Sequence, residues 1–269
     1  SAEPSFGAYD KHDSKIMAKL PYIADYRGNR EGFFVSNNGF TIQFDYEVSG
    51  KQPAFFSVSD RALKDLSPDV SKATAIDMKA TIIEADGLKI TDWEDNYYPK
   101  LNGRNLSIKP YEFSRSVAIS PDKQSFLLGT SWHLRYYDRQ GTEKWNVTAP
   151  ATPWMINISG DSKVAVIAFG DGIIRWYRLK DGKNILSLFP HNDRKRWVLW
   201  TTSGYYDASA GAEELIGWHV NNSPDMASDF FSISRFRNTY YRTDMIEKVL
   251  ETLDEKVAIK LANEESGKK

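Results

Sequence analysis

Residues 116–122 read SVAISPD and are followed at 134–138 by LRYYD, and the same plan returns about forty residues later. Residues 155–161 read MINISGD and are followed at 174–178 by IRWYR. The two copies stay in step, with 39 residues from Ile119 to Ile158, 40 from Arg135 to Arg175 and 41 from Gly141 to Gly182. A repeat of this length, made of short alternating strands with turn residues between them, is typical of the blades of a β-propeller.

Each copy can be divided into strands and turns. Val117 and Ile119 alternate with Ala118 and Ser120, which is the period of a strand with two different faces. Residues 121–123 form a turn, in which an aspartate can accept a hydrogen bond from its own backbone two residues on. The sequence therefore predicts an all-β propeller, with four-stranded antiparallel blades at 114–149 and 153–190.

Other stretches fit the blade pattern less completely. They are a blade start at 33–39 with strands at 41–46, 54–58 and 61–66, a further copy opening at 197–201, and a closing half-blade at 6–10 and 16–20. Because the chain begins with this closing half-blade at 6–10 and 16–20, we expect a partial or C-terminal portion of a larger propeller. Propellers usually have four to eight blades. We assign the blades to residues 1–222, with an irregular insertion at about 68–112.

The insertion supplies the first candidate binding residues. Trp93, Tyr97 and Tyr98 lie together outside the blade rhythm, where packing within a blade does not explain them. Aromatic side chains are enriched at binding hot spots, so we predict that this segment contacts a protein partner. The alternative is that it only covers the edge of the ring.

A basic triplet supplies the second set of candidates. Arg194, Lys195 and Arg196 follow one another between two predicted strands. The triplet is either a solvated hairpin edge or a contact for an acidic protein partner.

The pattern changes after the last blade, and residues 223–269 form a C-terminal extension. A C-terminal α-helix is predicted at about 244–262, with Asp244 as its N-cap. An apolar stripe recurs at helical spacing through Ile246, Val249, Leu250, Leu253, Val257 and Leu261. We expect this stripe to dock either on the last blade or on a second molecule, and we favour docking within the same chain. The aromatic run of Phe230, Phe231, Phe236, Tyr240 and Tyr241 is the expected receiving surface.

Composition excludes several classes of partner and site. The chain has 269 residues, 41% of them apolar and 13% aromatic, which is enough to build a core. Its net charge is −1 with acidic and basic residues interspersed, which disfavours nucleic acid as a partner. Without cysteine there is no disulfide and no zinc–thiolate site. No apolar run is long enough to span a membrane, and we expect neither a metal nor a cofactor.

No residue pattern points to catalysis. Ser187, His191 and Asp193 could be arranged as a triad, but their spacing matches no nucleophile motif. The acidic residues at 92–95 lack the spacing and the glycine of a calcium-binding EF-hand loop. The chain is therefore predicted not to be an enzyme.

A block near the end of the blade region carries a family resemblance. Its segments are FPHNDRKRWVLW at 189–200, GYYDAS at 204–209, IGWHVN at 216–221 and DFF at 229–231. With TDW at 91–93 and PKLNG at 99–103, they resemble bacterial WD40-repeat β-propeller proteins of the group often fused to a caspase-like peptidase domain. The chain departs from the general WD40 pattern at 175–177, where RWY stands in place of the usual Trp-Asp pair.

Three functions remain open at this point. The first is a non-catalytic scaffold for protein–protein interaction, because propeller loops are displayed on a rigid frame. The second is a hydrolase with its site at the propeller channel. The third, implied by the resemblance, is a recruiting or regulatory module of a caspase-like protease, in contact with further blades or a peptidase domain of the same polypeptide.

Overall fold

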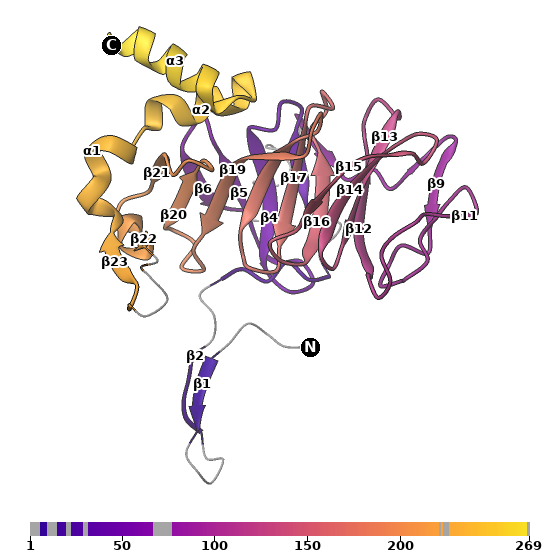
Figure 1. Cartoon of the computed structure of the whole chain (residues 1–269), viewed down its shortest axis with the longest axis horizontal. Coiled ribbons are helices and arrows are strands. Elements are labelled where there is room, and N and C mark those ends of the chain that lie inside the picture. Colours follow the sequence, from indigo (N-terminus) through magenta and orange to yellow (C-terminus); the bar gives the residue numbers. More distant parts are fainter. Residues whose placement is uncertain are drawn as a thin grey trace.

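Four antiparallel sheets are arranged as a propeller in the computed structural model of this chain (Figure 1). The structure describes residues 6–9, 15–19, 23–28, 32–66, 77–220, 222 and 226–267. Helices follow the blades near the C-terminus and lie at one corner of the molecule (Figure 1).

The third and fourth blades are the two units that the repeat predicted. The third consists of β12 (Ser114–Ile119), β13 (Ser125–Thr130), β14 (His133–Asp138) and β15 (Glu143–Thr148). The fourth begins with β16 (Pro153–Ile158), β17 (Val164–Phe169), β18 (Ile174–Arg178) and β19 (Lys183–Pro190). Arg135 lies opposite Leu128, and Arg175 lies opposite Ile167, at the same rung of each ladder. The predicted equivalence of the two blades is confirmed.

The turns after the first strands are also equivalent. The Ser120 hydroxyl donates to Asp122 Oδ1 over 2.6 Å, and the Ser159 hydroxyl donates to Asp161 Oδ1 over the same distance. Each aspartate also accepts from the backbone N–H two residues further on, at 3.0 and 3.1 Å. These local hydrogen bonds explain why the Ser-x-Asp signature recurs in the sequence.

The first blade follows the predicted strands closely. It contains β3 (Phe34–Ser36), β4 (Thr41–Glu47), β5 (Lys51–Ser57) and β6 (Ala62–Asp65). A fifth strand, β7 (Met78–Ala80), pairs with β3 on the side away from β4.

The expectation of an irregular insertion at about 68–112 needs correction, because part of it forms the second blade. That blade consists of β8 (Glu84–Ala85), β9 (Leu88–Thr91), β10 (Lys100–Leu101) and β11 (Arg104–Asn105). Strands of two to four residues are too short to show a period in the sequence, and burial of Leu88, Ile90 and Leu101 against the third blade stabilises them. Residues 67–76 lie outside the described residues.

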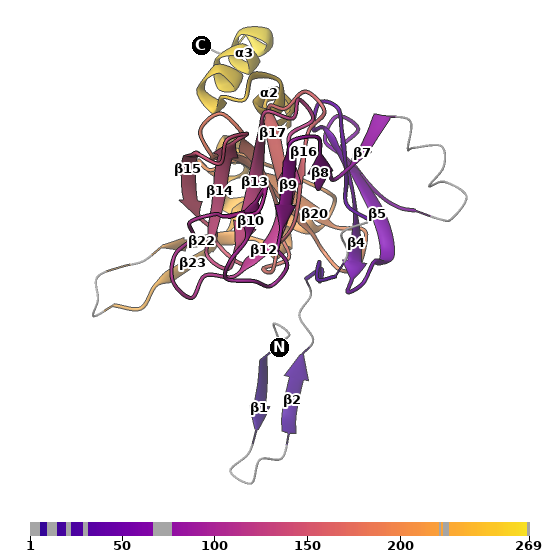
Figure 2. The ribbon, with the colours of Figure 1, turned by 90° about the vertical axis from the view of Figure 1, so that its right-hand side faces the viewer.

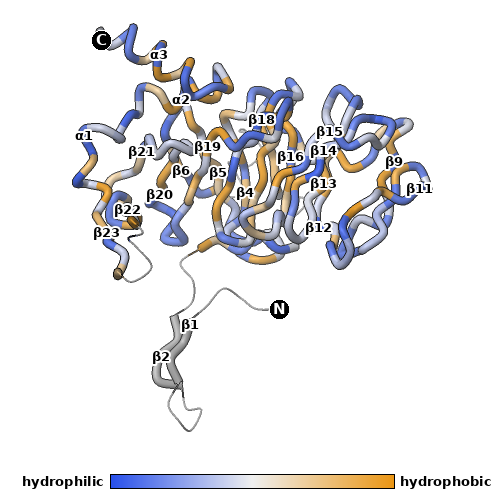
Figure 3. The backbone as a smooth tube through the Cα atoms, viewed as in Figure 1, coloured by the Kyte–Doolittle hydropathy of each residue, from blue (hydrophilic) through white to orange (hydrophobic). Residues whose placement is uncertain are grey.

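Hydrophobic contacts order the blades as second, third, fourth and first. One buried cluster joins the second blade to the third, another joins the third to the fourth, and the largest joins the fourth to the first. In the turned view, β4 and β5 of the first blade lie on one side of β12 and β16, and β14 lies on the other (Figure 2). Hydrophobic residues concentrate on the strands and hydrophilic residues in the turns (Figure 3).

The prediction that a new blade opens at residue 197 is wrong. β20 (Trp197–Trp200) pairs with β19, and β21 (Tyr206–Ala208) pairs with β20, so both extend the fourth blade to six strands. A new blade would need the chain to return to the inner edge of the ring. Instead, the His191 N–H donates to the Arg196 carbonyl over 2.9 Å and closes a short loop that keeps the chain at the outer edge.

The two strands expected to close a blade near the N-terminus do form a hairpin. β1 (Phe6–Tyr9) pairs with β2 (Lys15–Lys19) in antiparallel fashion. Within the described part of the chain, this hairpin is a sheet of its own and joins none of the four blades.

The helix predicted at about 244–262 is two helices with different buried faces. After a short α1 (Arg237–Tyr240), α2 (Thr243–Thr252) ends where Leu253 adopts a left-handed conformation with φ of +54°, and α3 (Glu255–Ser266) follows. The break ends the expected stripe, so Val257 and Leu261 are exposed, while Ala258 and Ala262 are buried. The helix caps also differ: Asp244 lies inside the first turn of α2, and Asp254 caps α3 by accepting from two backbone N–H groups.

The expected docking of the stripe on the last blade of the same chain is confirmed for α2, but the predicted aromatic surface does not receive it. The α2 residues Met245, Ile246, Val249 and Leu250 belong to the largest cluster, with residues of β19 and β20 in the fourth blade and of the first blade. The aromatic residues expected to receive the stripe pack elsewhere: Phe236 contacts Trp218, and Tyr240 contacts both Tyr205 and Trp218. Short elements occupy the intervening chain, namely the 3₁₀ helices at Ala212–Leu215 and Ile233–Phe236 and the hairpin of β22 (Gly217–Val220) and β23 (Asp229–Ser232).

The repeated glycines mark contacts between neighbouring blades. Gly141 and Gly182 both have positive φ, at +85° and +69°. A Cβ atom on Gly141 would lie 2.9 Å from Leu101 Cδ2 of the second blade, and one on Gly182 would lie 2.7 Å from Trp145 Cε3 of the third. Glycine is therefore required at this position for two reasons, the backbone conformation and the side chain of the preceding blade.

We expect Gly182→Ala to lower the free energy of unfolding by about 2 to 4 kcal/mol, because the strain of a left-handed alanine and the overpacking against Trp145 both destabilise the folded state. Gly103→Ala is the matched control, since φ at Gly103 is +80° but no atom lies within 4 Å of the new Cβ. In the control only the backbone strain is added, so its free energy of unfolding should fall by about 1 to 2 kcal/mol. Urea denaturation of both variants measures the difference, and equal losses would contradict the blade contact.

Candidate functional site

The loop between β9 and β10 is held against the start of the third blade. The Asn96 carbonyl accepts hydrogen bonds from both the backbone N–H and the hydroxyl of Ser114, each at 2.9 Å. The Asn96 side chain accepts from the Tyr98 N–H over 2.9 Å. These bonds fix the aromatic residues of the loop on a rigid strand.

Two aromatic residues from other segments complete a continuous surface. The rings of Tyr97 and Phe113 are 3.9 Å apart between centroids. The guanidinium of Arg115 lies 5.0 Å from the Phe113 ring and 5.5 Å from the Trp154 ring, and it forms an ion pair with Asp95. Arg115 therefore bridges the loop and the first strand of the fourth blade. We call Trp93, Tyr97, Tyr98, Phe113, Arg115 and Trp154 the aromatic surface.

An apolar pocket of about 210 Å³ adjoins this surface. Trp93 and Trp154 line it together with Ile83 and Ile156. The segment that leads from β7 to β8 crosses the inner strands here, with the Thr81 hydroxyl donating to the Ile156 carbonyl over 2.9 Å. The pocket thus lies between the first strands of two blades and the chain that crosses them.

The three aromatic candidates differ in exposure. Tyr98 is 66% exposed and Tyr97 is 39% exposed, so their rings are available to a partner. Trp93 is half-buried and packs against the cluster between the second and third blades. Trp93 therefore packs against the core and also lines the pocket.

Sequence reasoning missed Phe113, Arg115 and Trp154. Arg115 and Trp154 are 39 residues apart, at the same position of two equivalent blades, each one residue after the first residue of its inner strand. This repeat position was the available signal. Their meeting with residues 93–98 depends on tertiary contacts alone.

The basic triplet lies in the loop between β19 and β20, at the outer part of the fourth blade. Arg194 pairs with Asp65 at 2.7 Å, and Arg196 pairs with Asp193 at 2.6 Å. Burial opposes ionisation of Asp193, but the backbone N–H groups and guanidinium that bind it hold its pKa below the ordinary value. Two of the three cations are therefore neutralised within the chain. β19 lies three strands, roughly 14 Å, from the inner strand that carries Trp154.

Of the three residues considered for a catalytic triad, His191 and Asp193 lie together, with His191 Nδ1 3.0 Å from Asp193 Oδ2, and Ser187 lies apart from them. Ser187 and His191 are four residues apart along or just past an extended strand, about 13 Å, and the Ser187 hydroxyl donates to Asn184 Oδ1 over 3.4 Å. Asp92 pairs with Lys100 at 2.8 Å, and Asp95 pairs with Arg115. Across the described residues, no group of three or more His, Cys, Asp or Glu side chains could hold a metal ion.

Comparisons with known proteins give only partial structural matches. No protein-family model and no curated protein matches the chain. It is similar to structures titled "Structure of U3-55K" and "Crystal structure of RRP9 WD40 repeats", each at 10% identity and a TM-score of 0.31, covering 39% of this chain and 41% of that chain. It is also similar to BamB from Moraxella catarrhalis, at 16% identity and a TM-score of 0.31, covering 48% of this chain and 46% of that one.

The chain thus spans less than half the length of each of these three structures. None of the helices in its described part has the length and apolar character needed to cross a bilayer.

Proposed function

We propose that this chain is a non-catalytic propeller scaffold that binds a segment of a partner protein at the aromatic surface. The observation that carries the proposal is that exposed Tyr97 is connected through Phe113 and Arg115 to Trp154, which lines the apolar pocket. Binding energy at protein interfaces concentrates in aromatic residues and arginine around pockets that exclude water. The aromatic surface combines these residue types on loops held by a rigid frame.

Recognition would use the two parts of the surface differently. One large apolar side chain of the partner would enter the pocket between Trp93 and Trp154, where its burial from water favours binding. The neighbouring residues of the partner would pack on Tyr97 and Tyr98. Arg115 already lies between two rings, so little conformational entropy would be lost on binding there.

We expect Tyr98→Ala to weaken partner binding about thirtyfold or more, the loss typical of a hot-spot residue, without changing the melting temperature. Phe230→Ala is the control, because Phe230 is 69% exposed on a different hairpin. Peptides selected by display on the wild-type chain provide the ligand. Their affinities for the wild type and for both variants are then measured by isothermal titration calorimetry.

The selected peptides should share one large apolar residue and should lose binding when it is replaced by alanine. An Ile83→Asp variant, which places a charge at the wall of the pocket, should lose binding as well. Selected peptides that bind both Tyr98→Ala and Ile83→Asp as tightly as the wild type would refute the aromatic surface as the site.

The resemblance to WD40-repeat proteins fused to peptidases supports a narrower proposal, that the scaffold recruits substrates for or regulates a caspase-like protease. It rests on the sequence segments at 189–200, 204–209 and 216–221. The test is to read the coding frame on both sides of this chain and to search it for a peptidase with a paired His and Cys. A frame without such a domain would overturn fusion to the protease.

A further inference from the structure

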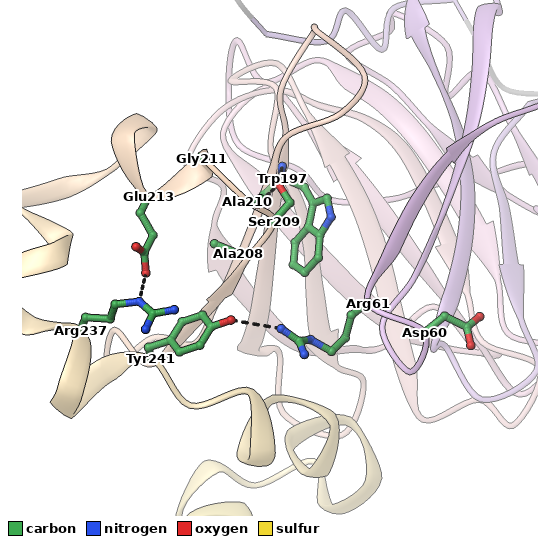
Figure 4. Close-up of a pocket in the computed structure, with 10 residues that line it drawn as sticks. All are labelled: Asp60, Arg61, Trp197, Ala208, Ser209, Ala210, Gly211, Glu213, Arg237 and Tyr241. Atoms are coloured by element: carbon green, nitrogen blue, oxygen red, sulfur yellow. Dashed lines mark hydrogen bonds and ion pairs between the residues drawn. The ribbon is translucent and has the colours of Figure 1, made fainter.

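A cavity of about 770 Å³ lies away from the aromatic surface, where three parts of the chain meet. Figure 4 shows the residues that line it. Arg61 comes from the turn between β5 and β6 of the first blade, and Trp197 comes from β20. Arg237 and Tyr241 come from α1 and the residue that follows it. Cavities at such junctions are preferred sites for ligands.

The two arginines are held in place by carboxylates at the wall. The Arg61 Nε and Nη2 atoms donate to Asp207 at 2.6 and 2.7 Å, and Nη2 also donates to the Tyr241 hydroxyl at 3.2 Å. The Asp207 side chain is almost fully buried. Arg237 Nε donates to Glu213 at 2.8 Å, and its guanidinium lies 4.2 Å from the Tyr241 ring. Both guanidinium groups are thus oriented before any ligand arrives.

Each guanidinium keeps donors that the protein does not use. Among the described residues, Arg61 Nη1 and both Nη atoms of Arg237 have no hydrogen-bond partner. The close-up places these two groups on opposite sides of the Tyr241 ring (Figure 4). Planar guanidinium groups with free N–H pairs recognise carboxylate and phosphate groups.

The surrounding charges select between these two anions. Asp207 balances Arg61, and Glu213 balances Arg237. Asp60 adds a further negative charge at the edge, although its carboxylate points away from the cavity (Figure 4). A nearly neutral lining favours a singly charged anion over a doubly charged phosphate, which the nearby carboxylates would repel.

Small residues give the ligand room. Ala208, Ser209, Ala210 and Gly211 form the wall between Trp197 and Glu213. Trp197 is itself 4% exposed, so its indole forms a firm floor and not a mobile lid. The space beside the two arginines therefore depends on residues without long side chains.

We propose that this cavity binds a carboxylate, with Arg237 and Arg61 as its hydrogen-bond donors. The carboxylate belongs either to an acidic peptide or to a free small carboxylic acid. Because the ligand would contact the first blade and the helical segment together, its binding stabilises their association.

The probes are propionate, a hexapeptide of alternating glutamate and glycine, and inorganic phosphate, each titrated into the full chain by calorimetry and followed by thermal shift. Saturable binding of propionate, a singly charged carboxylate, assigns the source to a free acid, and binding of the peptide alone assigns it to a protein segment. Arg237→Gln should lower the affinity for the probe that binds about tenfold or more, since charged hydrogen bonds are lost. Arg237→Lys keeps the charge but loses the planar pair of donors, so its affinity for the probe should lie between those of the wild type and Arg237→Gln.

Arg235→Gln is the matched control, because Arg235 is two residues away and stacks on Phe231 instead of lining the cavity. It should leave binding unchanged. Ala210→Leu, which narrows the space beside the arginines and leaves both of their charges in place, should weaken binding. Absence of saturable binding by both carboxylate probes, tighter binding of phosphate, or equal affinity of Arg237→Gln and the wild type would each overturn the proposal.

Discussion

Replacing Glu112 by alanine is expected to lower the free energy of unfolding by about 3 to 5 kcal/mol, because it leaves a buried arginine without its main counter-charge. The Glu112 side chain is completely buried in the third blade. Its two oxygens accept from Arg135 at 2.8 and 3.2 Å, from the Lys109 N–H at 2.8 Å and from the Thr130 hydroxyl. His133 Nδ1 lies 3.1 Å away.

The opposite side of the same arginine provides the control. Arg135 also pairs with Glu143 at 2.6 Å, but the Glu143 side chain is 29% exposed. Glu143→Ala should therefore cost only about 1 kcal/mol. The double variant Glu112→Leu/Arg135→Met should recover much of the loss, since it removes both buried charges together. Chemical denaturation measures all three, and equal losses for Glu112→Ala and Glu143→Ala would contradict the network.

The acid dependence of stability follows from the same network. Burial by itself would raise the pKa of Glu112, but the hydrogen bonds from Arg135, Thr130 and the Lys109 N–H hold it below the ordinary value of 4.5. A carboxyl with a lowered pKa in the folded state contributes stability above its unfolded pKa and loses it as the pH falls through the folded pKa. The stability difference between the wild type and Glu112→Gln should therefore shrink below about pH 4.5.

Replacing Val249 by aspartate is expected to lower the free energy of unfolding by about 3 kcal/mol or more and to release α2 and α3 from the propeller. Val249 is completely buried in the cluster shared by α2, the fourth blade and the first blade. An unpaired carboxylate is strongly destabilising in this apolar cluster. Separation of α2 and α3 from the propeller hydrates the carboxylate and leaves the blades folded.

Val257→Asp is the matched control, because it is the same substitution on the neighbouring helix at a side chain that is 46% exposed. It should leave the melting temperature within about 2 °C of the wild type, as surface substitutions do. Limited proteolysis within 243–266 reports release of the helices directly. Similar protection of both variants would show that α2 does not depend on this contact.

Val249 and Val257 also show which features of the helices the sequence predicts and which it does not. Both belong to one apolar stripe with helical period, and nothing in that period distinguishes them. The left-handed Leu253 breaks the helix between them, so α3 presents Ala258 and Ala262 to the core and leaves Val257 outside. The break depends on how the chain packs after α2, which the period of the stripe does not report.

The blades divide in the same way. The third and fourth blades and the strands of the first could be predicted because their alternation and their Ser-x-Asp turns are interactions between residues close in sequence. The short strands β8, β10 and β11 could not, because two residues have no detectable period, and packing of the second blade against the third stabilises them. The candidate binding residues follow this division too: Tyr97 and Tyr98 were visible as a local aromatic run, and Phe113 and Trp154 were not.

A forty-residue repeat of alternating strands and specific turns is a local property of the chain, so the class of fold could be predicted from the residues alone. Tertiary contacts determine which blades touch, where β20 and β21 pair, and which residues form the aromatic surface and the cavity. Trp176 is buried in the fourth blade, and its indole donates to the Gly39 carbonyl of the first, 137 residues away. Contacts at such separations depend on how all the packed surfaces are arranged, so a local sequence pattern does not predict them.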